Sequence, residues 1–353
     1  MKKYLKMAAI TLTAALALCG CGAANQERQD SPEQEESATA EAVSAVSEDE
    51  SSAGSGTDSD EMANVYNISY REPDKEGICE YFLEGYDVSQ MPEANPQNGL
   101  VDIAYEDTRL SFTTTGISYM ADDLSDALGG IAWDWFDRAR MEAGEGSPDS
   151  DDNIEAVKKD LTKLLLREGE ELVAETVIVK EAAQLPGVMK EYDVYDDTFT
   201  PDAEKYYFLQ FGVEKDGIPI MNFAEADQTY QVEIWGAQRT GIDVVCADSK
   251  VLFLSVSGLY EYGEAESGKL ISQEEARKIA EEKNSLLLTD TAKKDLSTAA
   301  VWLEYVGLPD YTRSDFALDK LAPYWCISWP DEDGYPQAIR INAITGGDLA
   351  YGE

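Results

Sequence analysis

Hydrophobic and polar residues alternate with a period of two between Gly99 and Tyr119. That period is typical of β-strands, so the stretch predicts strands or hairpins. Apolar residues then recur at helical spacing from Asp122 to Met141 and from Asp152 to Arg167, which predicts two helices. Asp152 with Glu155 fits a capping box at the start of the second helix.

Strand-like runs of β-branched and aromatic residues continue through the rest of the chain. They cover Leu172 to Val179, Tyr206 to Phe211, Tyr230 to Trp235, Asp243 to Cys246, Val251 to Tyr262, Ala299 to Val306, Tyr324 to Trp329 and Ala338 to Ile344. Ser272 and Glu275 form a second capping box, which predicts a further helix.

A helix followed by strands therefore occurs twice, and each copy carries an aromatic strand ahead of an Asp-Gly turn, at Asp216-Gly217 and Asp333-Gly334. We predict an α+β fold of antiparallel sheets, each packed by a helix, arranged as tandem units.

The first 64 residues lack these patterns. Residues 1–21 combine three lysines with an uncharged run of about a dozen residues, too short for a bilayer core of roughly 30 Å, and so predict a signal peptide. Residues 22–64 are acidic and contain no aromatic residue, which predicts a disordered tether. The remainder divides into a β-rich part with one helix, 65–150, a first helix-plus-sheet unit, 151–265, and a second, 266–353.

The charge and residue content exclude several classes of function. With 70 acidic and 28 basic residues the net charge is −42, which opposes binding to nucleic acid. The chain contains no histidine, so catalytic triads with histidine and HExxH zinc sites are excluded. We expect no catalytic residues, no cofactor and no metal site, and interpret the acidic runs near Asp151 and Asp331 as a loop and a hairpin turn rather than calcium sites.

Three cysteines lie beyond the signal region, namely Cys79, Cys246 and Cys326, far apart in the sequence and in no CxxC pattern. Two interpretations stay open. Either two of these cysteines form a disulfide, or all three are buried thiols, since an unpaired cysteine behaves as a small apolar residue.

The signal segment ends in Leu18-Cys19-Gly20-Cys21, which resembles a bacterial lipobox. The resemblance implies that the chain is cut before Cys21 and that the Cys21 thiol carries a diacylglyceryl group. Cys19 fits less well, because bulky Leu18 precedes it where a small residue is wanted. The implied location is the extracytoplasmic face of a Gram-positive-type cell membrane.

The sequence from Ile341 to Asp348, Ile-Asn-Ala-Ile-Thr-Gly-Gly-Asp, resembles the last strand of PepSY-like domains of the bacterial envelope. Together with the Gly217-Ile-Pro-Ile220 hairpin and the lipobox, it is similar to an uncharacterised lipoprotein family of Gram-positive bacteria. The resemblance implies a protein that restrains or modulates envelope proteins or peptides and has no catalytic residue. Asn342, Thr345 and Gly346 are interpreted as turn residues.

The predicted function is thus a lipid-anchored, non-enzymatic lipoprotein that binds or modulates an envelope protein or peptide. The partners expected are the membrane, through the lipid on Cys21, and that protein or peptide. The alternative is a carbohydrate, cell-wall or solute-binding lipoprotein, and a hydrolase that uses two carboxylates comes third. An exposed apolar patch would favour the first, a cleft lined by tryptophans the second, and two buried carboxylates facing each other the third.

Overall fold

The computed structural model describes residues 61–96, 99–141, 151–194, 200–221, 240–285, 296–309, 318–330 and 336–347. They belong to one compact unit, Gly54–Glu353. Cys21, the signal segment and all but the end of the predicted tether lie outside the described residues, as do the predicted strand from Tyr230 to Trp235 and the Asp333-Gly334 turn. Among the described helices, none combines the length and apolar character needed to cross a membrane.

The larger of two sheets has eight strands, paired antiparallel in the order β2-β3-β4-β9-β8-β6-β5, with β7 on β6. The strands are β2 (Val101–Tyr105), β3 (Thr108–Phe112), β4 (Gly116–Met120), β5 (Glu170–Glu181), β6 (Lys205–Lys215), β7 (Ile218–Pro219), β8 (Gly241–Ala247) and β9 (Lys250–Ser257). Alternation between Gly99 and Tyr119 thus predicted three strands correctly.

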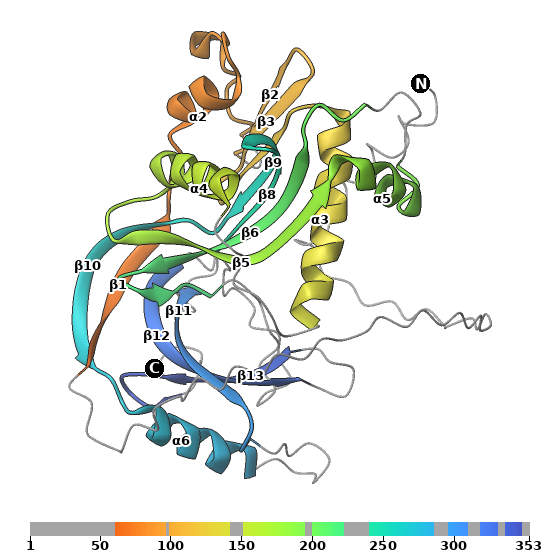
Figure 1. Cartoon of the computed structure of the whole chain (residues 1–353). Helices are drawn as coiled ribbons and strands as arrows, with labels where there is room; N and C mark the ends of the chain where they lie inside the picture. The colour runs from red at the N-terminus through yellow and green to blue at the C-terminus, as the bar shows by residue number, and fades with distance from the viewer. Residues whose placement is uncertain are drawn as a thin grey trace, which may run out of the picture. The chain divides into compact units, whose positions relative to one another are not determined.

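The smaller sheet has five strands, also antiparallel, in the order β10-β1-β12-β11, with β13 paired to β12. Its strands are β1 (Met62–Tyr70), β10 (Tyr260–Lys269), β11 (Ala300–Pro309), β12 (Leu318–Pro330) and β13 (Pro336–Asn342). It therefore joins the first strand of the described chain to the last three (Figure 1).

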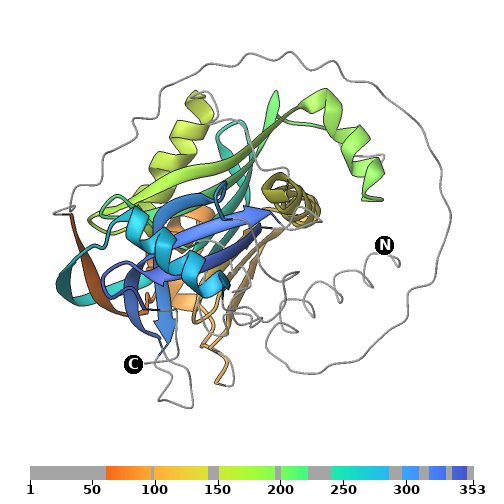
Figure 2. The same ribbon diagram turned by 90° about the horizontal axis from the view of Figure 1, so that it is seen from below.

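Helices pack on both faces of the larger sheet and on the smaller one (Figures 1 and 2). They are α2 (Lys75–Phe82), α3 (Asp123–Met141), α4 (Asp152–Leu165), α5 (Leu185–Glu191) and α6 (Gln273–Ser285), with short 3-10 turns at η2 (Val88–Gln90) and η3 (Ala182–Gln184). Both predicted capping-box helices are present, as is the helix predicted from Asp122 to Met141.

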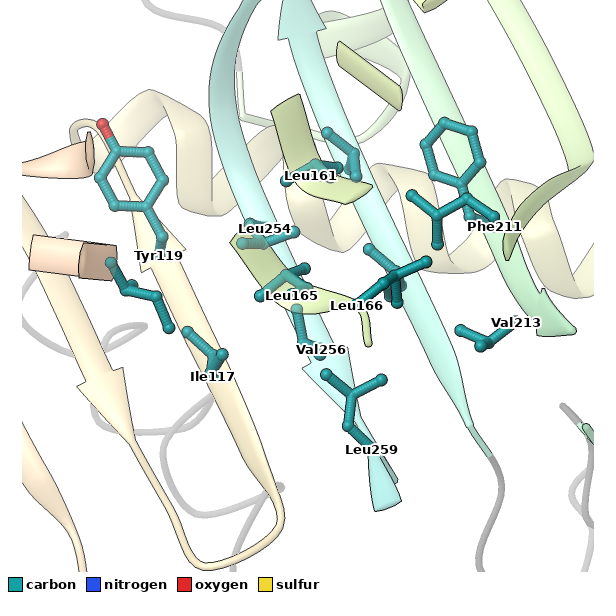
Figure 3. Packing of buried hydrophobic residues seen from close by; sticks show 14 of the residues in the cluster. Ile117, Tyr119, Leu161, Leu165, Leu166, Phe211, Val213, Leu254, Val256 and Leu259 are labelled. Atoms are coloured by element: carbon teal, nitrogen blue, oxygen red, sulfur yellow. The ribbon is translucent and has the colours of Figure 1, made fainter. Parts of the chain in front are cut away.

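The core is built from alternate strand residues. Leu161 and Leu165 of α4 pack with Phe211 of β6 and Leu254 of β9 in one buried cluster (Figure 3). Phe136 of α3 belongs to a second cluster. Its strand members, which include Phe208 and Phe253, alternate along β6 with the strand members of the first cluster. Since neighbouring strand residues point to opposite faces, α4 and α3 cover opposite faces of the sheet.

The structure corrects four details of the sequence analysis. The N-cap of α4 is Asp151, one residue earlier than predicted, and its carboxylate accepts from the Asn153 amide at 2.8 Å. The predicted tether overlaps β1, which begins at Met62. The helices α2 and α5 were not predicted, because each is at most eight residues long and shows too few turns of apolar spacing.

The fourth correction concerns the division of the chain. The run from Val251 to Tyr262 is two strands, because the chain leaves β9 at Gly258, whose φ is 68°, and enters β10 in the other sheet. The predicted boundaries at 150/151 and 265/266 therefore cut across the sheets. The larger sheet takes strands from both sides of the first boundary, and the smaller sheet takes strands from both sides of the second.

Candidate binding site between the two sheets

The two sheets meet at the β6–β7 hairpin. Asp216 and Gly217 have φ values of 53° and 76°, the left-handed pair that a two-residue type I′ hairpin requires, as the Asp-Gly sequence predicts. Beyond β7, Ile220 forms a parallel bridge with Tyr305 of β11, and the Met221 amide donates to the Tyr305 carbonyl at 2.7 Å. This connection places the ends of β5 and β6 beside β11.

A cavity of about 320 Å³ lies at this junction. The larger sheet and its hairpin contribute Val173, Glu175, Gly212, Val213, Glu214, Pro219, Ile220 and Met221, and the smaller sheet contributes Trp302, Glu304 and Arg340. Its size is at the lower end of the range for sites that hold small molecules or a few side chains. It reaches the surface at Val173, which is 37% exposed.

A buried ion pair lies in the cavity wall that the smaller sheet contributes. Arg340 Nε donates to Glu304 Oε1 at 2.7 Å, and the two side chains are 2% and 7% exposed. Strand register explains the pairing. Arg340 lies opposite Cys326, and Glu304 opposite Tyr324, so the arginine side chain crosses β12 diagonally. The small Cys326 side chain leaves room for that crossing.

Trp302 is held in the same network. It lies two residues before Glu304 on β11 and therefore on the same face, and its indole Nε1 donates to Glu304 Oε2 at 2.9 Å. Both Glu304 carboxylate oxygens are thus hydrogen-bonded, one to a guanidinium and one to an indole. This fixes the orientation of the aromatic side chain that lines the cavity.

The opposite wall carries two further carboxylates. A Cβ atom on Gly212 would lie 2.1 Å from Glu175 Oε1, so the absence of a side chain at Gly212 leaves space for the Glu175 carboxylate. Glu214, two residues along β6, is on the same face. With Glu304 the lining has three carboxylates against one guanidinium, so its net charge is negative. Negative charge beside an indole is suited to binding cationic or hydrogen-bond-donating groups.

A second buried ion pair has a structural role. Arg71 Nη2 lies 2.7 Å from Glu170 Oε1, and Arg71 also donates to the carbonyls of Leu165 and Tyr260. The Tyr262 hydroxyl donates to Glu170 at 2.6 Å, and burial together with the Glu170 charge raises the pKa of that phenol. The cluster connects β1, α4, β5 and β10.

The two buried carboxylates of the described residues are Glu170 and Glu304, and each is paired with its own arginine. A glycoside hydrolase needs two carboxylates facing a shared substrate, one of them protonated. Each of the two carboxylates faces its own arginine rather than the other carboxylate, so neither buried pair supplies that arrangement.

The three cysteines beyond the signal region are buried thiols in the structure, which agrees with the second of the two interpretations. Burial raises the pKa of the Cys246 thiol to about 12. Within the described ranges, no group of three acidic or cysteine side chains is arranged to hold a metal ion. Asp151 is the helix cap described above, and Asp331 lies outside those ranges.

The aromatic cluster from Trp133 to Phe136 divides between core and surface. Phe136 is fully buried, and Trp135 packs edge-on against Phe208 with ring centroids 4.7 Å apart. Trp133 is 46% exposed, and its Nε1 donates to Asp243 at 3.1 Å. Core packing therefore describes Phe136 and Trp135 but not Trp133.

The turn after β13 agrees with the predicted structural role of its residues. Asn342 Oδ1 accepts from the amides of Ile344 and Thr345 at 3.0 and 2.9 Å. Gly346 adopts a φ of 71°, and its amide donates to the Asn342 carbonyl at 2.9 Å. These residues form an Asx-type turn and are not part of the cavity wall.

None of the cavity residues was predicted as a site. The sequence did contain a signal, since Glu304 and Arg340 interrupt otherwise apolar strands, Val301 to Val306 and Ala338 to Ile341. A charged residue inside an apolar strand predicts a buried pair or a functional group.

No protein-family model matches the chain, and none of the curated proteins matches it. Among solved structures, the chain is similar to the crystal structure of an uncharacterized protein from Eubacterium rectale ATCC 33656. The sequence identity is 14% and the TM-score 0.47, and the match covers 82% of this chain and 86% of the other.

Proposed function

We propose that this chain is a lipoprotein anchored through Cys21 on the extracytoplasmic face of a Gram-positive-type membrane, where it binds or restrains an envelope protein or peptide without catalysing a reaction. The lipobox supports the anchor, and the lack of histidine supports the non-enzymatic role. The observation that carries the binding role is the cavity of about 320 Å³ between the sheets, with its fixed tryptophan and carboxylates.

The same proposal covers the finer architecture, two tandem PepSY-like units. The order α4-β5-β6-β7, with η3 and α5 inserted between β5 and β6, is followed later in the chain by α6-β11-β12-β13, and this shared order of one helix and three strands supports the repeat. The cavity is lined by β5, β6 and the β7 end of the hairpin from the first series, and by β11 and β13 from the second. On this proposal the binding site lies where the two units meet.

A second candidate is a lipoprotein that binds carbohydrate, cell wall or a small solute. It is favoured by Trp302, because an indole in a cavity wall can stack on a sugar ring. Trp302 is the single tryptophan among the described residues that line the cavity, whereas a stacking platform uses two or three.

The anchor is tested by feeding a clickable fatty acid to a Gram-positive host that expresses the full chain. We expect label on the wild-type protein and on Cys19→Ala, and none on Cys21→Ala. The Cys19→Ala variant is the matched control, because it removes a neighbouring thiol from the same segment. Label that persists in Cys21→Ala contradicts the assignment.

The binding role is tested by cross-linking in intact cells, followed by purification of the wild-type and Cys21→Ala chains. Recovery of one envelope protein or peptide with the anchored form, and its loss with the unanchored form, is the expected result. If neither form recovers a protein while the purified chain binds isolated cell wall or glycans, the second candidate replaces the first.

A further inference from the structure

The strand β5 forms one margin of the larger sheet (Figures 1 and 2). It pairs with β6 over its whole length, and no described strand pairs with its other side. At 12 residues it is more than twice as long as β2, the strand at the opposite margin. An unpaired edge presents a row of outward backbone donors and acceptors, which is the usual template for adding a strand.

Apolar side chains are exposed along this margin. Val173 and Val179 are 37% and 41% exposed, and both belong to β5. Two of the five large hydrophobic residues that are exposed in the described chain therefore lie on one edge strand. A partner strand would bury them, in addition to satisfying the outward backbone groups.

The side-chain alternation of β5 connects this margin with the cavity. Val173 and Glu175 point to the face that lines the cavity, whereas Leu172 is buried in the core on the other face. Directly opposed residues of paired strands have Cβ atoms about 4.5–5.5 Å apart on the same face. A strand added to β5 would thus place alternate side chains beside Val173 and Glu175, at the surface opening of the cavity.

The negative charge around β5 indicates the charge of the partner segment. Glu171, Glu175 and Glu181 lie on β5, and Glu214 lies on the neighbouring strand in the cavity wall. The basic residue of β5, Lys180, is already placed over the Trp135 ring at 5.0 Å. Pairing of β5 with a second copy of itself would bring carboxylates together, within a chain whose net charge is −42.

We propose that β5 is a docking strand for an extended, basic segment of the envelope partner. The segment adds to the edge of β5 and directs Lys or Arg side chains into the cavity, where Glu214 and the Trp302 ring receive them. The β-bulge between Ala174 and Thr176 divides the docking edge into two shorter ladders. This inference rests on the proposed binding function and names the partner's chemistry.

The probe is a synthetic peptide of alternating valine and lysine, titrated against the full-length protein in detergent micelles by fluorescence anisotropy. A valine–glutamate peptide of equal length and an N-methylated valine–lysine peptide are the comparison probes. We expect binding of the first peptide only, because N-methylation removes backbone donors and leaves the charge unchanged. Equal binding of the N-methylated peptide overturns strand addition.

Two variants test the location. Glu214→Gln, on the cavity face, is expected to weaken binding at least tenfold, whereas Glu181→Gln, its matched control on the other face of β5 beyond the bulge, changes it less than twofold. Equal losses in the two variants overturn the role of the cavity. Amide hydrogen exchange should show new protection along β5. Protection confined to the edges β2 or β10, or self-association through β5, also overturns the inference.

The cellular cross-linking experiment distinguishes failure of the docking strand from failure of the proposed binding function. Recovery of an envelope partner together with no peptide binding at β5 overturns the docking strand and retains the binding role. Absence of a partner together with peptide binding that does not depend on Glu214 overturns both.

Discussion

Two adjacent glycines in α3 are expected to respond in opposite directions to the same substitution. Gly130 is exposed, and a Cβ atom there would meet no atom within 4 Å. Gly130→Ala should therefore stabilise the protein by about 0.5–1 kcal/mol, the usual gain in helix propensity. At Gly129 a Cβ atom would lie 2.4 Å from Cε2 and 2.5 Å from Cδ2 of Phe253. Overpacking of this kind costs about 1–3 kcal/mol.

The Phe253 ring has little freedom to move away, because it is 2% exposed and packs against Trp133 with centroids 5.8 Å apart. The clash should exceed the gain in propensity, so the free energies of unfolding of Gly129→Ala and Gly130→Ala should differ by about 1–3 kcal/mol.

Urea denaturation monitored by tryptophan fluorescence measures this difference, provided that the two variants share one m-value. The double variant Gly129→Ala with Phe253→Leu should be less destabilised than the sum of its single variants, since the smaller side chain leaves room for the methyl group. If Gly129→Ala proves as stable as Gly130→Ala, the close packing of α3 on β9 is refuted.

Two further predictions concern buried ionisable groups. Glu170→Gln leaves the Arg71 guanidinium buried without its counter-charge and should cost about 3–5 kcal/mol in thermal or urea unfolding, whereas the exposed neighbour Glu171→Gln should cost less than about 0.5 kcal/mol. A cost below about 1 kcal/mol at Glu170 would contradict the pairing. The Cys246 pKa is raised from 9.0 to about 12, so its contribution to stability is complete below pH 9.0 and is lost as the pH rises toward 12. Cys246→Ser should flatten that alkaline decline, and an unchanged profile would contradict it.

Local patterns predicted most elements of the fold, because they depend on neighbours in the sequence. Alternation identified β2, β3 and β4, and apolar spacing with a capping residue identified α4 and α6. The error of one residue at the α4 cap arose because Asp151 and Asp152 are both competent caps, and which of them serves depends on its backbone conformation.

The candidate site could not be predicted in the same way. Its walls come from β5 and β6 in one sheet and from β11 and β13 in the other, and the bridge between Ile220 and Tyr305 holds the β6–β7 hairpin against β11. No local pattern encodes that bridge, or the departure of the chain at Gly258 from one sheet to the other. Glu304 and Arg340 were recognisable as unusual residues, but their pairing depends on both flanking β12.

The position of β1 has a consequence for the order in which the molecule assembles during synthesis. This strand is made first among the described elements, yet its hydrogen-bonding neighbours are β10 and β12, and Asn67 contacts Lys320 across 253 residues of sequence. Closing so long a loop is slow compared with forming hairpins such as β2–β3. The smaller sheet therefore completes last, and until the C-terminal strands exist β1 has an unpaired margin. Chains truncated before β12 should be the forms that aggregate or are degraded.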